Sequence, residues 1–273
     1  MKKRGRVNTN SKAQTTIFII IAVVIVAVVA GVVYLNQVSK QTELQEVFTK
    51  LGITEQVSTV ESSILNCLDE TAESSLIVIG IQGGFYNEPE KFFDLGWAII
   101  PYYYDNGEFL KPSTDTIESE LSVYIDDNAR YCFESLEYEN FDLAYKASET
   151  KTEIKKGEVS FKTDLSLTIS KSDLTSDFKL KKHPVVIESS LYDILEVADY
   201  ITESHKEDPE MICINCVADM AEIRNLYVDM IDFGDDETTT LTVISENYTS
   251  SEPYIFEFLN KYPITDIEIP PAP

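Results

Sequence analysis

The sequence predicts an α+β protein: an N-terminal transmembrane helix with a stalk, followed by an extracytoplasmic domain of mixed helices and antiparallel strands. Residues 17–35 are uncharged and predominantly apolar. Beyond them, apolar residues recur every three or four positions in some stretches and every second position in others, as in helices and half-buried strands respectively. These stretches come in blocks rather than in strict alternation, which favours α+β over α/β.

The apolar run 17–35 has the length of a membrane span. A helix rises about 1.5 Å per residue, so the run extends roughly 29 Å, close to the thickness of a bilayer's hydrocarbon core. Basic residues precede the run, which places that end in the cytoplasm, and the first acidic residue is Glu43. We expect a single-pass cell-membrane protein with a cytoplasmic basic head (1–16), a helix in the lipid bilayer (17–35), a stalk (36–52) and one extracellular domain (53–273).

Two other interpretations of this run stay open. A signal peptidase could cut after Ala30, although the run exceeds the roughly 7–15 apolar residues of a cleavable signal. Residues 12–16 (KAQTT) resemble the archaeal class III, type IV pilin-like signal, which is cut just before a glutamine such as Gln14. Phe18 stands where that family has a glutamate that registers neighbouring subunits, which argues against filament assembly. We favour an uncleaved anchor.

The composition excludes some partners. The net charge is −25, and apart from the basic head there are 17 Lys and Arg against 47 Asp and Glu. So negative a surface repels nucleic acid and anionic lipid. The content of 44% hydrophobic and 11% aromatic residues indicates a folded domain rather than a disordered tail.

Apolar periodicity predicts helices over four stretches. In 54–80, apolar residues recur at helical spacing, and Gly83 and Gly84 end the helix. In 115–136, Asp115 and Glu118 suit the helix start and Cys132 lies on the apolar face. Two further helices are expected over 189–205 and 209–230.

Strands are expected elsewhere. The apolar stretch 97–104 leads into the turn Asp105-Asn106-Gly107, and Pro101 makes it an edge or interrupted strand. Residues 159–169 alternate with period two, as in half-buried strands. The remaining strands are predicted over 178–187, where Pro184 limits pairing, and over 238–247 and 253–258.

The four cysteines are the strongest chemical signal in the chain. An even number outside the cytoplasm suits disulfides, and four cysteines allow three pairings. Cys67 and Cys132 each lie on the apolar face of a predicted helix, so pairing them would join two helices. Closing a loop of that size is worth about 4 kcal/mol in the chain-entropy model. Cys213 and Cys216 would then form a local pair.

The Cys213-x-x-Cys216 spacing is also that of thiol–disulfide oxidoreductases, in which a helix N-terminus lowers the pKa of the first thiol. The residues before Cys213 predict a helix start rather than the strand that such enzymes have there. A metal site would need a second pair or nearby histidines, and the chain has only His183 and His205. We favour a structural disulfide, with the redox interpretation as its rival, and expect no metal and no cofactor.

Catalytic signatures of hydrolases and phosphate-binding loops are missing, so an enzyme is not the favoured interpretation. Aromatic residues that follow the first long helix fill a core or form a surface for carbohydrate or protein, and we favour the core. They are Phe85, Tyr86, Trp97, Tyr102, Tyr103 and Tyr104. Asn247 begins the sequon Asn-Tyr-Thr, a candidate glycosylation site.

The residues around Cys67, the segments 80–85 (GIQGGF) and 99–104 (IIPYYY), and the helix carrying Cys132 resemble a group of uncharacterised archaeal single-pass surface proteins. Those proteins also open with a basic head, a Gln-Thr-Ile-Phe-like start and one membrane helix. The resemblance spans about residues 10–140 and implies an envelope location and a Cys67–Cys132 pair. We therefore expect a membrane-anchored surface protein with a structural, adhesive or binding role. The alternative is a tethered oxidoreductase that uses Cys213 and Cys216.

Overall fold

The computed structural model describes residues 42–55, 57–181, 184–207, 212–234, 238–246 and 253–263. It divides into a unit that ends at Val57 and a second unit from Ser58 onward. In the first unit, helix α2 (Thr42–Leu51) ends at Gly52, and the Ile53 N–H donates to the Phe48 carbonyl at 2.9 Å. The expected membrane helix 17–35 lies outside the described residues. None of the helices that are described combines the length and hydropathy that a membrane span requires.

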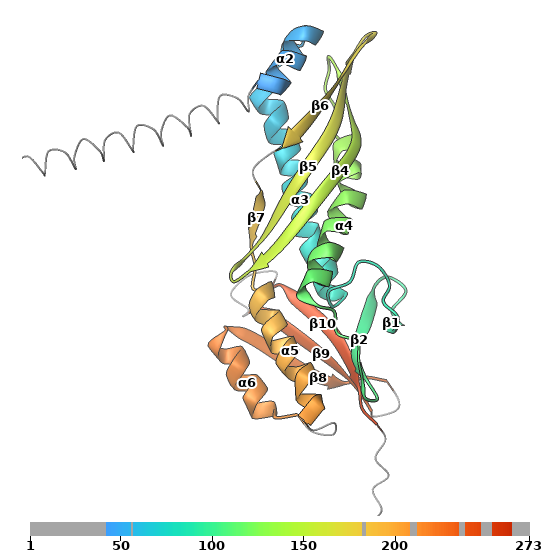
Figure 1. Cartoon of the computed structure of the whole chain (residues 1–273), viewed down its shortest axis with the longest axis vertical. Helices are drawn as coiled ribbons and strands as arrows, with labels where there is room; N and C mark the ends of the chain where they lie inside the picture. Colours follow the sequence, from blue (N-terminus) through green and yellow to red (C-terminus); the bar gives the residue numbers. More distant parts are fainter. Residues whose placement is uncertain are drawn as a thin grey trace, which may run out of the picture. The chain divides into compact units, whose positions relative to one another are not determined.

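The second unit confirms the α+β class and contains two sheets (Figure 1). The first sheet has the strand order β1-β2-β10-β9-β8, and β3 pairs with β2. All neighbours are antiparallel except β2 and β10, which are parallel. The strands are β1 (Phe92–Asp94), β2 (Ile99–Asp105), β3 (Glu108–Phe109), β8 (Leu226–Asp232), β9 (Thr239–Glu246) and β10 (Ile255–Lys261).

Of the two alternatives for strand β2, an edge strand is wrong, because β2 lies between β1 and β10. An interrupted strand agrees with its pairing, which changes partner after Pro101. Its Pro101 is opposite Phe92 of the short strand β1, and the ladder with β10 begins one residue later, at Tyr102. Proline has no N–H to donate, and Pro101 lies outside the ladder between β2 and β10, so no hydrogen bond of that ladder is lost.

The second sheet has the order β4-β5-β6, with β7 also paired to β5. Its strands are β4 (Asp142–Lys155), β5 (Glu158–Lys171), β6 (Leu174–Lys181) and β7 (Val185–Glu188). The period-two prediction for 159–169 is confirmed, because Val159, Phe161, Leu165, Leu167 and Ile169 are all buried. The single strand expected over 178–187 is two strands, and Pro184 lies between them.

Helices α3 (Val57–Ile81) and α4 (Thr114–Glu134) confirm the first two helix predictions. The Ser113 hydroxyl caps α4 by accepting from the Thr116 N–H at 3.1 Å. A disulfide between Cys67 of α3 and Cys132 of α4 joins the two helices. The turn after α3 comes close to β10, since an added Cβ at Gly83 would lie 2.4 Å from the Glu257 carbonyl oxygen.

Helix α4 covers the outer edge of the long strand β4. Three α4 side chains, spaced four residues apart and therefore on one face, accept hydrogen bonds from alternate backbone N–H groups of β4. The pairs are Glu118 with Ile154 at 2.8 Å, Ser122 with Thr152 at 3.1 Å and Asp126 with Thr150 at 3.1 Å. An edge strand whose N–H groups are satisfied in this way is protected from pairing with other chains.

The substitution Asp126→Ala is expected to lower the free energy of unfolding by about 2 kcal/mol, because it leaves several half-buried donors without their acceptor. Asp126 also accepts from the hydroxyls of Ser148 and Thr150, at 2.7 and 2.8 Å. Chemical denaturation measures the change. The control is Asp127→Ala, the exposed neighbour on the same helix, which we expect to have almost no effect. Equal losses in both variants would contradict this role of Asp126.

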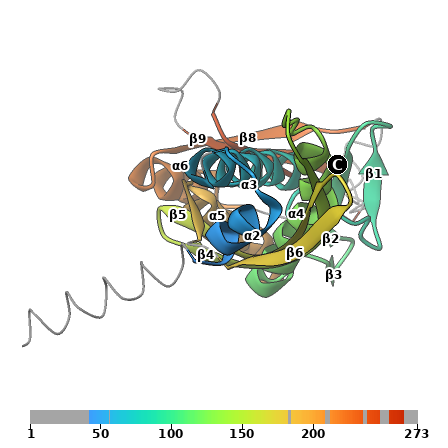
Figure 2. The ribbon, with the colours of Figure 1, turned by 90° about the horizontal axis from the view of Figure 1, so that it is seen from above.

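Helices α5 (Leu191–Glu207) and α6 (Ile214–Ile223) lie on one face of the first sheet (Figures 1 and 2). The prediction for α5 is confirmed. The helix expected over 209–230 is wrong in its second half, because α6 ends at Ile223 and β8 begins at Leu226. Asn225, at φ 57°, makes the turn between them. Asparagine tolerates this left-handed conformation better than most residues.

Candidate functional site

Cys213 and Cys216 stand at the start of α6 and form a disulfide. Cys213 is the N-cap of the helix, and its sulfur accepts from the Cys216 N–H at 3.3 Å. Cys213 is exposed and Cys216 is half-buried. The pair therefore opens a helix, the position in which a helix dipole favours a thiolate. The sequence analysis placed the pair inside a helix that began earlier.

A groove of about 760 Å³ lies between α6 and β8. The α6 wall consists of residues spaced three or four apart, which places them on one face of the helix. Apolar side chains predominate along both walls. The lining residues are Ile214, Val217, Ala218, Ala221, Glu222, Asn225, Leu226, Tyr227, Val228 and Met230. Because Ile214 directly follows Cys213, the disulfide adjoins one end of the groove.

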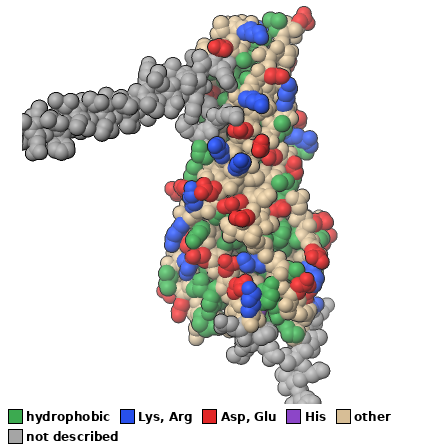
Figure 3. All heavy atoms as spheres, in the orientation of Figure 1, with side chains coloured by type: hydrophobic (Ala, Val, Ile, Leu, Met, Phe, Trp, Pro, Cys, Tyr) green, Lys and Arg blue, Asp and Glu red, His purple; other side chains and the backbone are tan. Residues whose placement is uncertain are grey.

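Exposed apolar side chains occur on both elements that form the groove. Ile214 and Ile223, at the two ends of α6, are 59% and 83% exposed, and Tyr227 and Ile231 of β8 are also exposed. Figure 3 shows the acidic and basic side chains interspersed over the visible face, with hydrophobic side chains among them near α6. Large aliphatic side chains grouped at the surface of a very acidic chain mark a candidate interaction site.

Ion pairs hold α6 in place against α5. Arg224, directly after α6, donates from Nε and a terminal nitrogen to Glu196 of α5, at 3.0 and 2.8 Å. Another nitrogen of the same guanidinium donates to the Met220 carbonyl at 3.2 Å. A planar guanidinium that makes several bonds at once fixes orientation as well as distance. The α6 wall of the groove is therefore anchored.

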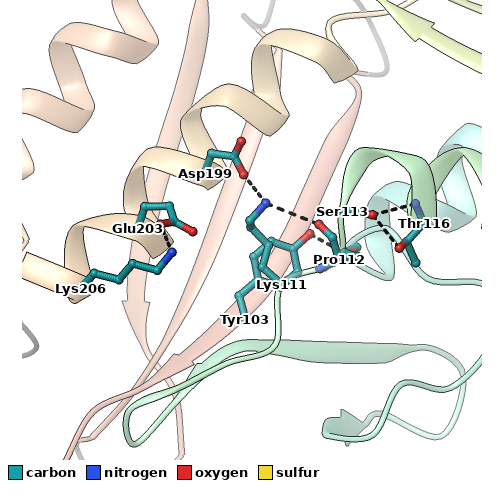
Figure 4. A network of polar contacts seen from close by, with 9 residues as sticks. Tyr103, Lys111, Pro112, Ser113, Thr116, Asp199, Glu203 and Lys206 are labelled. Atoms are coloured by element: carbon teal, nitrogen blue, oxygen red, sulfur yellow. Dashed lines mark hydrogen bonds and ion pairs between the residues drawn. The ribbon is translucent and has the colours of Figure 1, made fainter.

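Helix α5 is itself tied to the segment that precedes α4 (Figure 4). Lys111 reaches from that segment to form an ion pair with Asp199 of α5. In the next turns of α5, Lys206 pairs with Glu203 and lies over the ring of Phe109 at 5.0 Å. These contacts position α5 between the β2–β3 hairpin and α6.

The predicted aromatic cluster is divided between core and surface. Tyr103 is 0% exposed, stacks on Phe258 at 4.3 Å and donates its hydroxyl to the Gly83 carbonyl at 2.9 Å. Burial raises the pKa of the Tyr103 phenol well above its usual value. Tyr104 is also buried and stacks on His205. For these two residues the structure agrees with the favoured interpretation, packing in the core, and excludes them from a binding surface.

The remaining aromatic residues do not form one surface. Trp97 is 75% exposed in the loop between β1 and β2, whereas Phe85, Tyr86 and Tyr102 are half-buried. His205 is buried and contacts Tyr262. His183 and the sequon residue Asn247 lie outside the described residues. In the part of the chain that the structure describes, no three His, Cys, Asp or Glu side chains are grouped to hold a metal ion.

Sequence reasoning missed the groove because it continued the last helix through β8. Asn225 carried a usable signal, since asparagine is common at helix ends. The comparisons add no information on this site: no protein-family model, curated protein or solved structure matches the chain.

Proposed function

We propose that the chain is a membrane-anchored, extracytoplasmic surface protein that binds a partner through the groove between α6 and β8. The observation that carries the proposal is a groove lined by mainly apolar residues, with Ile214 and Ile223 exposed on its helix, on a chain of net charge −25. A surface this acidic gains nothing from exposed isoleucines unless they contact something else. Binding suits the groove better than hydrolysis or phosphate chemistry does, because the sequence carries no signature of either; the Cys213–Cys216 pair is the basis of a second candidate function.

The location rests on the apolar run 17–35 and on the charges to either side of it. Lysines and arginines precede the run, and all 47 acidic residues of the chain follow it. The two disulfides suit an oxidising compartment. The loose resemblance to archaeal single-pass surface proteins points the same way.

A membrane-impermeant amine reagent on intact cells tests this orientation. We expect mass spectrometry to find label on exposed lysines of the folded unit, such as Lys151 and Lys179, and none on Lys2 and Lys3. A lysate, in which both sets are reachable, is the control. Label on Lys2 and Lys3 in intact cells, or none on the folded unit, would contradict the proposed orientation.

Binding through the groove is tested by photo-crosslinking on intact cells. A photoreactive phenylalanine analogue replaces Ala218, an exposed residue of the groove wall, and in a control it replaces Lys179, an exposed residue of β6. We expect discrete crosslinked species from position 218 and none from position 179. Equal crosslinking, or none at either position, would overturn the binding role of the groove.

A second candidate function, thiol–disulfide exchange, is favoured by one observation: the exposed Cys213 caps the N-terminus of α6 and is bonded to Cys216. Equilibration with glutathione buffers tests it. A reduction potential between about −120 and −270 mV, as in disulfide oxidoreductases, supports this function. A potential below about −300 mV, as in structural disulfides, excludes it.

A further inference from the structure

Strand β8 has one unoccupied edge within the described residues, where it pairs with β9 alone. Just after β8, the Phe233 N–H donates to the Thr239 carbonyl at 2.7 Å. In an antiparallel ladder, residues that bond the neighbouring strand alternate with residues that point away from it. Four residues of β8 therefore direct their N–H and C=O groups away from β9: Leu226, Val228, Met230 and Asp232.

Other edges among the described strands are protected. Helix α4 satisfies N–H groups along β4, and β1 is only three residues long. Strand β6 carries lysines, including the exposed Lys179, which discourage pairing. Strand β8 has seven residues and no lysine, and its only charges are Asp229 and Asp232. Among the described edge strands longer than four residues, β8 is the one whose edge lacks such protection.

The groove adjoins this edge. Val228 and Met230, whose backbone groups point outward, also line the groove with their neighbours on α6. Directly opposed residues of neighbouring strands place their side chains on the same face of a sheet. A strand added beside β8 would therefore place alternate side chains in the groove, against Val217, Ala218 and Ala221. It would gain both backbone hydrogen bonds and apolar burial.

The acidic residues near the β8 edge favour an added strand that carries basic side chains. Glu222 lines the groove, and Asp229 and Asp232 lie on β8 itself. A second copy of β8 would bring aspartates beside aspartates, on chains that each carry a net charge of −25. Glu222 and Asp232 lie on the groove side, whereas Asp229 lies on the other face of β8, because side chains alternate along a strand. Basic side chains on the other face of an added strand would therefore lie near Asp229.

We propose that β8 takes up an extended peptide segment as an additional strand, with apolar side chains in the groove and basic side chains alternating with them. The inference rests on the groove being the binding site proposed above, and it adds the mode of binding and the chemistry of the partner. Backbone hydrogen bonds between β8 and the peptide provide affinity, and the alternating side chains of the peptide provide specificity.

The test uses blocked seven-residue peptides, titrated against the full-length chain in neutral detergent with fluorescence anisotropy as the readout. The first alternates lysine and valine, and the second alternates glutamate and valine. We expect the lysine peptide to bind at least about tenfold more tightly, because its lysines are attracted to Asp229 and to the acidic chain, whereas the glutamates of the second peptide are repelled. Equal affinities would overturn the proposed charge selection.

N-methylation of the lysine peptide tests strand addition directly. In an added strand, the N–H groups of every second residue point toward β8. We therefore compare a peptide methylated at the valine nitrogens with one methylated at the lysine nitrogens. One of the two should lose binding, and the other should keep it. An antiparallel strand predicts sensitivity at the valines. Equal binding by both methylated peptides would overturn strand addition.

Substitutions of Val228 test whether the backbone of β8 binds the peptide, because the Val228 N–H points to the open edge. Val228→Pro removes that donor without touching a bond to β9, and should weaken binding of the lysine peptide about tenfold. Val228→Ile keeps both the N–H and a β-branched apolar side chain in the groove, and should weaken binding clearly less than the proline does. Equal binding by both variants, with unchanged circular dichroism, would contradict the proposal.

The two proposals fail in distinguishable ways. If Ala218 crosslinks on cells but no peptide binds with the expected N-methyl pattern, strand addition is wrong and the groove remains a binding site. If the peptide binds with that pattern but Ala218 and Lys179 crosslink equally, the edge accepts strands in isolation and the proposed cellular function is wrong.

Discussion

Removing the disulfide between Cys67 and Cys132 is expected to lower the free energy of unfolding by about 4 kcal/mol. The two cysteines are 65 residues apart in sequence, so the bond removes much of the freedom of the unfolded chain. It also joins α3 to α4, and α4 supports the edge of β4. The double substitution to alanine, compared with the original chain by chemical denaturation in neutral detergent, measures the loss.

The second disulfide is the matched control for this prediction. Cys213 and Cys216 are three residues apart, and the same entropy model gives roughly 1.5 kcal/mol for so short a loop. The double substitution of these cysteines to serine should therefore cost less than half as much. If the two pairs cost the same, chain entropy is not the reason that the Cys67–Cys132 bond stabilises the fold.

Substitution of Gly80 by alanine is expected to lower the free energy of unfolding by about 3 kcal/mol. An added Cβ would lie 2.3 Å from the Ile255 carbonyl oxygen and 2.9 Å from the ring of Tyr254. Both distances are below van der Waals contact, so α3 must move away from the chain at the start of β10. Alanine's better helix propensity offsets only about 1 kcal/mol of this cost.

Ser74→Ala on the same helix is the control for Gly80. Ser74 is exposed, so its substitution should change stability by about 0.5 kcal/mol or less. Denaturation of both variants under the same conditions separates the steric contact from helix propensity. A Gly80→Ala variant as stable as the original chain would show that α3 and β10 do not approach this closely in solution.

Several elements follow from periodicity along a single segment. The helical spacing from Val60 to Leu76 predicts the buried face of α3, and the alternation from Val159 to Ile169 predicts β5. The positions of Cys67 and Cys132 on helical apolar faces favour the pairing that the structure contains. These features depend on which side of one element is apolar, and the sequence records that directly.

Strand β4 shows why other elements escaped prediction. Few of its side chains are buried, and its outer N–H groups are satisfied by polar side chains of α4 rather than by another strand. Such a strand has no strong alternation of apolar residues to detect. Its state depends on a helix that precedes it in the sequence and on a pairing with β5 that periodicity does not reveal.

The aromatic residues near β2 make the same point about the site. Tyr103 and Tyr104 are buried, whereas Trp97, a few residues earlier, is largely exposed. All are aromatic and lie within one apolar stretch, so composition gives them equal weight. Their different roles follow from the partners that other segments bring, such as Phe258 beneath Tyr103 and His205 beside Tyr104.

By itself, the sequence determined the α+β class, the disulfide-bearing helices and the period-two strand β5, because each depends on the order of apolar residues within one segment. It also supplies the charge asymmetry on which the proposed membrane orientation rests. Only the tertiary structure decided that residues 226–232 are a strand with a free edge beside an apolar groove. That outcome depends on pairing with β9 and on the ion pairs that hold α6 against α5, contacts between segments that no local pattern encodes.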